Sequence, residues 1–171
     1  MRKISTICSS YKSINKIEIL INSFISQNYN DKELIIVDGT TNYSEHQSFK
    51  NKIIQFENIK IFHLPNASIY ACLNFGIKKS SGEIINIMGD DDRYFNNKIF
   101  SKISDYFNKS IDYVYGDTLY EKNKKLKRFY KSFDLNKNFM RIGYMPSHTS
   151  LFLLKKVYND LGEYNLKYLI A

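Results

Sequence analysis

The residues best suited to chemistry are three consecutive aspartates, Asp90, Asp91 and Asp92, which follow Gly89 and an almost continuous apolar run. Adjacent carboxylates repel one another, and a hard divalent cation that takes oxygen ligands, such as Mn²⁺ or Mg²⁺, relieves that repulsion. A site with one or two carboxylates leaves metal positions for phosphate oxygens and water, which suits a nucleotide diphosphate. Without further context, a solvated turn that caps the next helix is the commoner arrangement for such residues.

A second acidic loop begins at Asp38, which stands between the apolar run 33–37 and Gly39. In open α/β sheets, ligands bind at the carboxyl ends of the strands. Asp38 and the three aspartates both follow expected strands, so we expect them to face one crevice. The alternative for Asp38 is an ordinary turn residue before a glycine.

The elements that position these residues follow from the pattern of apolar residues. Short β-rich runs alternate with segments of helical period, which predicts an α/β fold whose parallel sheet has helices on both faces. Two β-leaning runs between 118 and 131 predict an antiparallel hairpin, and hence a mixed, mostly parallel sheet. The expected strands are 4–8, 33–37, 59–63, 83–88, 112–115 and 150–154, and the expected helices are 15–27, 44–56, 68–79, 97–107 and 155–161.

Composition sets the class of partner and the compartment. The length of 171 residues fits one domain, and the net charge of +8 favours a nucleotide diphosphate, an anionic membrane surface or nucleic acid, although an AT-rich coding genome also produces such a Lys- and Asn-rich chain. Cys8 and Cys72 lack a metal-binding spacing, which indicates neither a disulfide scaffold nor a zinc site and favours the cytoplasm. No long apolar segment follows the start, so we expect any membrane contact to be peripheral, at the inner face of the cell membrane.

Two other classes of nucleotide-binding enzyme are disfavoured by the residues after the first strand. The run 8–12, Cys-Ser-Ser-Tyr-Lys, contains no GxGxxG, which argues against a nicotinamide-dependent enzyme. It also lacks the Gly-rich phosphate loop of a sugar-nucleotide nucleotidyltransferase. The basic run 122–128 is interpreted first as a solvated loop and second as a membrane contact. We expect no nucleic acid partner, because no aromatic-stacking module accompanies this run.

Six sequence blocks, taken in order, resemble the GT-A glycosyltransferases of family 2, particularly bacterial polysaccharide and lipopolysaccharide enzymes. Each block alone is weak evidence, whereas the ordered set spans nearly the whole chain. The blocks are 4–11, 35–39 (Ile-Ile-Val-Asp-Gly), 68–77, 89–94 (Gly-Asp-Asp-Asp-Arg-Tyr), 114–117 (Val-Tyr-Gly-Asp) and 146–150 (Pro-Ser-His-Thr-Ser). The resemblance implies a Rossmann-like GT-A fold, with residues 1–171 as a single nucleotide-sugar-binding domain.

The resemblance also implies roles for the acidic residues. Asp38 would accept a hydrogen bond from the nucleotide base, such as uracil. Asp91 would lie near the ribose or the donor sugar. Asp92 would hold the Mn²⁺ or Mg²⁺ ion that bridges the diphosphate, and Asp90 would complete an Asp-X-Asp motif.

Further residues are assigned by resemblance to the donor and acceptor sides. Tyr11, Tyr70 and Asn74 would face the donor; the alternatives are helix packing for Tyr70 and a solvent-facing Asn74. His148 would lie on the acceptor side, or serve as a hydrogen-bonded structural residue. Asp117 is more simply a turn cap than an acceptor-side residue.

The chain departs from the family pattern in two places. Ser-Ser-Tyr-Lys at 9–12 replaces Pro-Thr-Tyr-Asn, so only Tyr11 matches. The carboxylate that acts as general base follows a segment like 164–171, so we expect the catalytic residue beyond Ala171 and an incomplete domain.

Two functions follow from the resemblance and its departures. The first is an inverting, metal-dependent glycosyltransferase that moves a sugar from a nucleotide-diphosphate donor, such as a UDP-sugar, to a cell-surface glycan or lipid-linked acceptor. The alternative is a noncatalytic nucleotide-sugar-binding remnant that lacks the general base.

Overall fold

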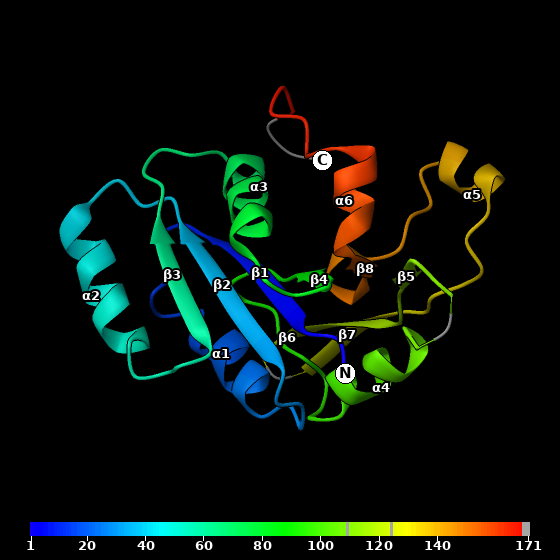
Figure 1. Cartoon of the computed structure of the whole chain (residues 1–171), viewed down its shortest axis with the longest axis horizontal. Coiled ribbons are helices and arrows are strands. Elements are labelled where there is room, and N and C mark those ends of the chain that lie inside the picture. The colour runs from blue at the N-terminus through cyan, green and yellow to red at the C-terminus, as the bar shows by residue number, and fades with distance from the viewer. Residues whose placement is uncertain (109, 124, 169–171) are drawn as a thin grey trace.

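The computed structural model describes residues 1–108, 110–123 and 125–168, and its main feature is an α/β sheet with helices on both faces (Figure 1). The six strands of this sheet run in the order β3-β2-β1-β4-β8-β5. Their bounds are β1 Ile4–Ser10, β2 Lys32–Asp38, β3 Ile59–His63, β4 Ile84–Ile87, β5 Tyr113–Val114 and β8 Phe152–Leu154. The predicted fold class is confirmed.

The sheet is mixed, but for a different reason from the one the sequence indicates. Strands β3, β2, β1 and β4 are parallel, whereas β8 runs antiparallel to both β4 and β5. The predicted hairpin exists as β6 (Thr118–Lys122) and β7 (Lys125–Tyr130), yet it forms a separate two-stranded sheet. The expectation that this hairpin makes the main sheet mixed is therefore wrong. Its side chains are mostly exposed, so it has no buried face with which to join the main sheet.

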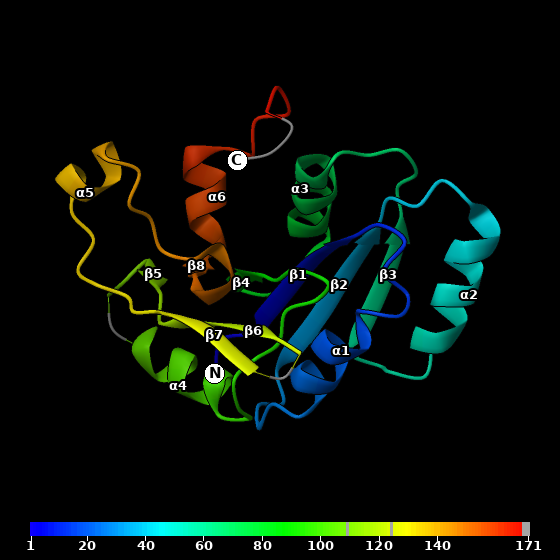
Figure 2. The same ribbon diagram turned by 180° about the vertical axis from the view of Figure 1, so that it is seen from behind.

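Five of the helices cover the two faces of the main sheet (Figures 1 and 2). Helices α1 (Glu18–Ile25), α2 (Tyr43–Ile53) and α4 (Ile99–Tyr106) pack in one apolar core, and α3 (Ile69–Lys79) and α6 (Lys155–Leu161) pack on the opposite face. The short helix α5 (Lys137–Arg141) and the 3₁₀ helix η1 (His148–Ser150) were not predicted, because so few residues show no period. Within the described residues, no helix is both long enough and apolar enough to cross a bilayer.

The central strands are buried on both faces, as a parallel strand between two helical layers must be. All seven residues of β2 are buried, which explains its continuous apolar run. Gly76 lets α3 lie directly on β1, because a Cβ atom there would come within 2.5 Å of Ile7 Cγ2. A larger residue at position 76 would therefore push α3 away from the sheet.

At the amino ends of the strands, the buried carboxylate of Glu33 joins three strands. Ser5 Oγ and Ser81 N donate to its Oε1 at 2.7 and 2.6 Å, and Lys60 Nζ donates to its Oε2 at 2.8 Å. Burial alone would raise the pKa of Glu33, but these hydrogen bonds outweigh it and lower the pKa to about 2. This edge is thus fixed by a charged group, at the end of β2 opposite Asp38.

Candidate functional site

The loop after β1 lies between the two acidic loops. Its Lys12 N donates to Thr40 Oγ1 at 3.0 Å, in the loop after β2, and its Ser13 Oγ donates to the carboxylate of Asp90. Both acidic loops therefore lie at the carboxyl edge of the sheet, one on each side of the β1 loop. Tyr11 begins this loop and is exposed, so its ring is accessible to a ligand at the same edge.

The three aspartates form a tight turn that depends on Gly89. Asp92 N donates to Gly89 O at 3.3 Å, and Gly89 N donates back to Asp92 Oδ2 at 3.0 Å. A Cβ atom at position 89 would lie only 2.7 Å from Asp92 Oδ2, so a glycine is needed for this close approach. Asp91 is exposed, whereas Asp90 and Asp92 are half-buried. Within the described part of the chain, Asp91 accepts no side-chain hydrogen bond, so its oxygens remain available.

Negative charge is concentrated at this turn. Burial raises the pKa of Asp92, the turn's own backbone N–H and the nearby His148 lower it, and the charges of Asp91 and Asp90 raise it further. The pKa of the buried Cys8 thiol is raised well above its ordinary value, first by desolvation and then by the same three carboxylates. Two separate groups thus respond to one local excess of negative charge, which a divalent cation would neutralise.

A buried polar group fixes the segment after the turn. The hydroxyl of Tyr94 donates to Asn86 Oδ1 at 2.7 Å, and because it has a single proton it accepts the 2.7 Å bond from Thr6 Oγ1. The Asn86 amide in turn donates to Thr149 O at 3.1 Å and to Leu151 O at 2.9 Å. The side chain of Asn86 therefore supports both the segment that follows the aspartate turn, through Tyr94, and the segment that contains η1.

Neither Tyr94 nor Asn86 was singled out from the sequence as a positioning residue. The available signal was Asn86 itself, a polar residue inside the apolar run 84–88. A buried amide in a central strand needs hydrogen-bond partners, and these come from other strands and loops. His148, which does lie on the held segment, is exposed and close enough to Asp92 to lower its pKa.

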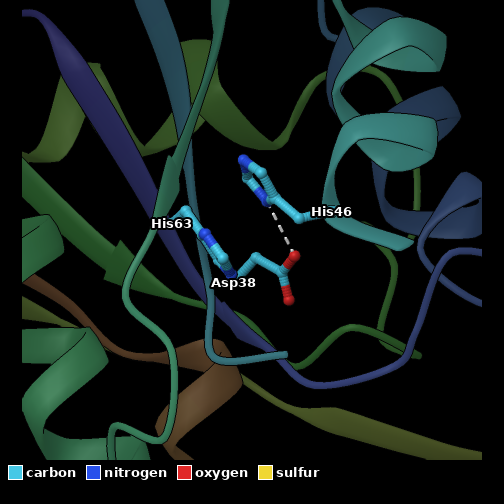
Figure 3. Close-up of side chains that lie close together, drawn as sticks. All are labelled: Asp38, His46 and His63. Atoms are coloured by element: carbon cyan, nitrogen blue, oxygen red, sulfur yellow. Dashed lines mark hydrogen bonds and ion pairs between the residues drawn. The ribbon is translucent and has the colours of Figure 1, made fainter. Parts of the chain in front are cut away.

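Asp38 belongs to a buried cluster with two histidines (Figure 3). Thr40 N donates to Asp38 Oδ1 at 3.0 Å, and His46 Nδ1 lies 2.9 Å from Asp38 Oδ2. The rings of His46 and His63 are stacked with centroids 4.1 Å apart, and His63 Nε2 lies 2.7 Å from Thr40 O. Since a carbonyl only accepts, His63 Nε2 carries a proton. No local sequence pattern marked His46, which lies on an ordinary-looking helix.

This cluster also contains potential metal ligands, because Asp38, His46 and His63 each place one ligand atom within 4.8 Å of the others. A metal binds imidazole along the nitrogen lone pair, in the plane of the ring. The two rings are stacked and only 11° from parallel, so both planes cannot contain one ion unless a ring rotates. The arrangement seen here is a hydrogen-bonded cluster that supports Asp38.

Tyr70 and Asn74 share one face of α3, and both contact Tyr164. Asn74 Nδ2 donates to Tyr164 O, and Tyr164 N donates to Asn74 Oδ1, each at 2.9 Å. The Tyr70 ring stacks on the Tyr164 ring, with centroids 5.3 Å apart. Asn74 is buried, so the alternative of a solvent-facing Asn74 is wrong. Donor contact by either residue stays a prediction. The segment 164–171, after which the general base is expected, is described only as far as residue 168.

Asp117 is held as a turn residue. Ser132 N and Ser132 Oγ both donate to Asp117 Oδ1, at 2.7 and 2.8 Å. These hydrogen bonds lower the pKa of Asp117, whereas a general base needs a pKa near the working pH. Asp117 is therefore poorly suited to act as the base.

The mixed sheet, with its acidic turns at the carboxyl edge, defines a GT-A (Rossmann-like) fold, and solved structures share it. S. aureus TarS (residues 1–349) superposes with a TM-score of 0.70 over 93% of this chain and 49% of that chain, at 19% identity. The mannosyltransferase PcManGT from Pyrobaculum calidifontis, solved with GDP-Man and Mn²⁺, superposes with a TM-score of 0.69 over 96% of this chain and 48% of that chain, at 12% identity.

Sequence comparison gives the family. Residues 5–161 match the model of Glycosyl transferase family 2, and the chain belongs to that family. A glycosyltransferase of Rickettsia bellii (strain RML369-C) is 33% identical over 124 residues, which are 70% of this chain and 17% of that protein. The UDP-Glc:alpha-D-GlcNAc-diphosphoundecaprenol beta-1,3-glucosyltransferase WfgD of Escherichia coli is 28% identical over 117 residues, which are 67% of this chain and 45% of WfgD. The chain spans less than half the length of each of these proteins.

Proposed function

We propose that the chain binds a nucleotide-diphosphate sugar, with a UDP-sugar as donor, between Asp38 and the aspartate turn Gly89–Asp92. It serves as the donor-binding domain of an inverting, metal-dependent glycosyltransferase of polysaccharide or lipopolysaccharide biosynthesis. The acceptor is a cell-surface glycan or a lipid-linked saccharide. The aspartate turn carries this proposal, because its three adjacent carboxylates lie at the ligand-binding edge of the sheet and a divalent cation relieves their repulsion.

Each donor-binding residue is assigned to one part of the donor. Asp38 accepts a hydrogen bond from the base, Asp91 lies near the ribose or the donor sugar, and Tyr11 contributes an exposed ring. Both oxygens of Asp38 already accept hydrogen bonds, but each carboxylate oxygen has a second lone pair with which to accept one more. Because Asp38 is only 1% exposed, contact with a base requires the groups that cover it to move.

The residues at the turn fit a divalent cation. Asp92 and Asp90 are the proposed ligands for Mn²⁺ or Mg²⁺, hard ions that take carboxylate oxygens. When bound, the ion neutralises the charge that develops on the departing diphosphate. Gly89 fixes the orientation of Asp92. His148, which is exposed and begins η1, is the proposed residue on the acceptor side.

The relatives support this proposal without deciding the donor. TarS has been crystallised with UDP and with UDP-GlcNAc, and PcManGT with GDP-Man and Mn²⁺. The name of WfgD specifies UDP-Glc as its donor and a diphosphoundecaprenol-linked GlcNAc as its acceptor. A uridine donor and a lipid-linked acceptor are accordingly the combination to test first.

A noncatalytic nucleotide-sugar-binding protein is the second candidate. It is favoured by Asp117 of the Val-Tyr-Gly-Asp block, because Ser132 N and Oγ both donate to its carboxylate and hold it as a turn residue and not as a free general base. Both candidates bind the donor. They differ in transfer, so glycosyl transfer to a lipid-linked acceptor by the 171-residue chain would exclude the second.

Calorimetric titration with UDP tests the shared part of both candidates. We expect binding in Mn²⁺ to exceed binding in EDTA, and the substitution Asp92→Asn to weaken the Mn²⁺-dependent binding at least about tenfold, as changes at metal sites typically do. Asp105→Asn, on the exposed side of α4, is the matched control and should bind normally. The proposal fails if UDP binds neither in the presence of Mn²⁺ nor in the presence of Mg²⁺.

A further inference from the structure

The segment between β5 and β8 contains most of the net positive charge of the chain. Residues 118–145 have eight Lys or Arg and two Asp or Glu, a net charge of +6, compared with +8 for the whole chain. A general bias in composition would spread this charge evenly, whereas it is gathered on one short segment. The segment comprises the β6–β7 hairpin and α5, and α5 lies at the end of the molecule opposite α2 (Figures 1 and 2).

The same segment exposes apolar side chains. Nine of the 22 large hydrophobic residues that are exposed in the described chain lie within it, including Ile142 at 75%. The nine are Leu119, Tyr120, Leu126, Phe129, Phe139, Met140, Ile142, Tyr144 and Met145. Exposed apolar groups concentrated in this way mark an interaction surface. Their mixture with Lys and Arg is the composition of segments that lie in a membrane interface.

Aromatic contacts join the hairpin and the α5 region into one unit. Tyr130 of β7 stacks with Tyr144 at 6.0 Å, and its hydroxyl donates to Met145 O at 2.9 Å. Phe133 packs against Tyr144 at 4.1 Å and against Phe139 at 5.3 Å. The end of β7 and the α5 region are therefore joined by direct contacts, although both lie outside the two apolar cores.

We propose that residues 118–145, the basic aromatic module, dock the protein onto an anionic lipid bilayer. Each Lys or Arg near an anionic leaflet is attracted to it, and the exposed aromatic and aliphatic side chains enter the interface between headgroups and acyl chains. The charge of the module is complementary to phosphatidylglycerol or cardiolipin headgroups. A second protein copy fits less well, because two such surfaces repel each other.

The module is connected to the aspartate turn. Arg93, directly after Asp92, donates to Glu121 of β6 at 2.6 Å, and His148 follows the module by three residues. This inference rests on the proposed function, which includes a lipid-linked acceptor. A bilayer bound at the module would bring such an acceptor to the His148 side of the site. The docked module thus defines which edge of the sheet faces the membrane.

Vesicle sedimentation tests the docking. The protein is mixed with vesicles of phosphatidylcholine alone, or with about 30% phosphatidylglycerol, in low and high salt. We expect binding only to the anionic vesicles, and weaker binding in high salt. Neutralising Lys125 and Lys127 to Gln should weaken it about fivefold per charge, the equivalent of about 1 kcal/mol each. Neutralising Lys50 and Lys52 of α2 to Gln changes the net charge equally and should leave binding unchanged.

A second variant separates the apolar contribution from the charge. Ile142→Ser removes the most exposed of the large apolar side chains in the module, so it should weaken binding without changing the salt dependence. Thermal unfolding of each variant checks that the fold is retained. UDP titration without vesicles reports on the donor site alone, so failure of the docking and failure of the proposed function are distinguishable.

Several results would overturn the docking. These are equal binding to neutral and anionic vesicles, no binding to either, or equal losses in the two double-lysine variants. Sedimentation velocity tests the alternative partner, a second copy of the chain. If the protein self-associates, Ile142→Ser abolishes that self-association and no vesicles are bound, the surface is a contact between two copies and the bilayer is rejected.

Discussion

The side chains of Tyr94 and Asn86 are joined by a 2.7 Å hydrogen bond that connects the end of the aspartate turn to the middle of β4. Asn86 extends the connection to Thr149 and Leu151, so one buried amide supports both the acidic turn and the segment that carries η1. The geometry of the candidate site therefore depends on polar groups that no ligand would touch.

Tyr94→Phe should destabilise the fold and loosen the site. The change leaves Asn86 Oδ1 and Thr6 Oγ1 buried without their partner, which costs about 1 to 3 kcal/mol of the free energy of unfolding. Urea unfolding measures this loss, and Mn²⁺-dependent UDP binding should fall as well. Tyr106→Phe, at an exposed position of α4, serves as the control. Equal unfolding midpoints for the two variants would show that the buried group is unimportant.

Gly89→Ala should impair Mn²⁺-dependent UDP binding. The new methyl group would meet Asp92 Oδ2 at 2.7 Å and displace the carboxylate, so we expect a loss of about 10- to 100-fold, typical of changes beside a metal ligand. Calorimetry measures the loss. Gly116→Ala is the matched control, because a Cβ atom at 116 has no neighbour within 4 Å. Unchanged UDP affinity in Gly89→Ala would show that Asp92 does not need its present orientation.

Glu33 should make stability fall in acid. Its pKa of about 2 in the folded protein lies below the ordinary value of 4.5, so its contribution is complete above about pH 4.5 and is lost as the pH falls toward 2. Glu33→Gln should therefore lower the free energy of unfolding at pH 7 by about 3 to 4 kcal/mol, since one pKa unit equals about 1.4 kcal/mol. Urea unfolding from pH 7 to pH 2 tests this, and the two proteins should converge at the acid end. A gap that stays constant with pH would contradict the assignment.

His46→Phe should separate the hydrogen bond to Asp38 from the ring stack. The phenyl ring can still pack on His63, but Asp38 Oδ2 loses its partner. An unsatisfied buried acceptor costs about 1 to 3 kcal/mol, so the urea midpoint should fall. Tyr43→Phe keeps the neighbouring ring and removes only an exposed hydroxyl, so it should unfold normally. Normal stability in His46→Phe would mean that the stack alone holds this loop.

Local sequence patterns were sufficient for the longer helices, for the strands and for the acidic turns, but not for α5 and η1. Apolar period predicted β2 and α3 because each buries a continuous face, and Asp38 and the three aspartates were found because they follow apolar runs. Asn86 was equally visible as a polar residue inside such a run. Its meaning was missed because two of its partners, Thr149 and Leu151, lie 63 and 65 residues away in the sequence.

The remaining differences also come from contacts distant in sequence. The position of β8 between β4 and β5 depends on pairing between Ile84 and Leu154, which neither segment specifies by itself. The burial of Asn74 depends on the backbone of Tyr164 in the same way. His46 gained its role from the packing of α2 beside β3, and helical period does not reveal that a histidine will meet a carboxylate.

The placement of β8 has a consequence for the order in which the protein can fold during synthesis. Strand β4 is internal in the finished sheet, yet its second neighbour is encoded about 70 residues later. Until the ribosome releases that segment, β4 presents an unpaired apolar edge, and the amide of Asn86 has no carbonyl to bind. Such edges invite pairing with other nascent chains. The strand that leads into the aspartate turn therefore stays open to such pairing until β8 has been synthesised.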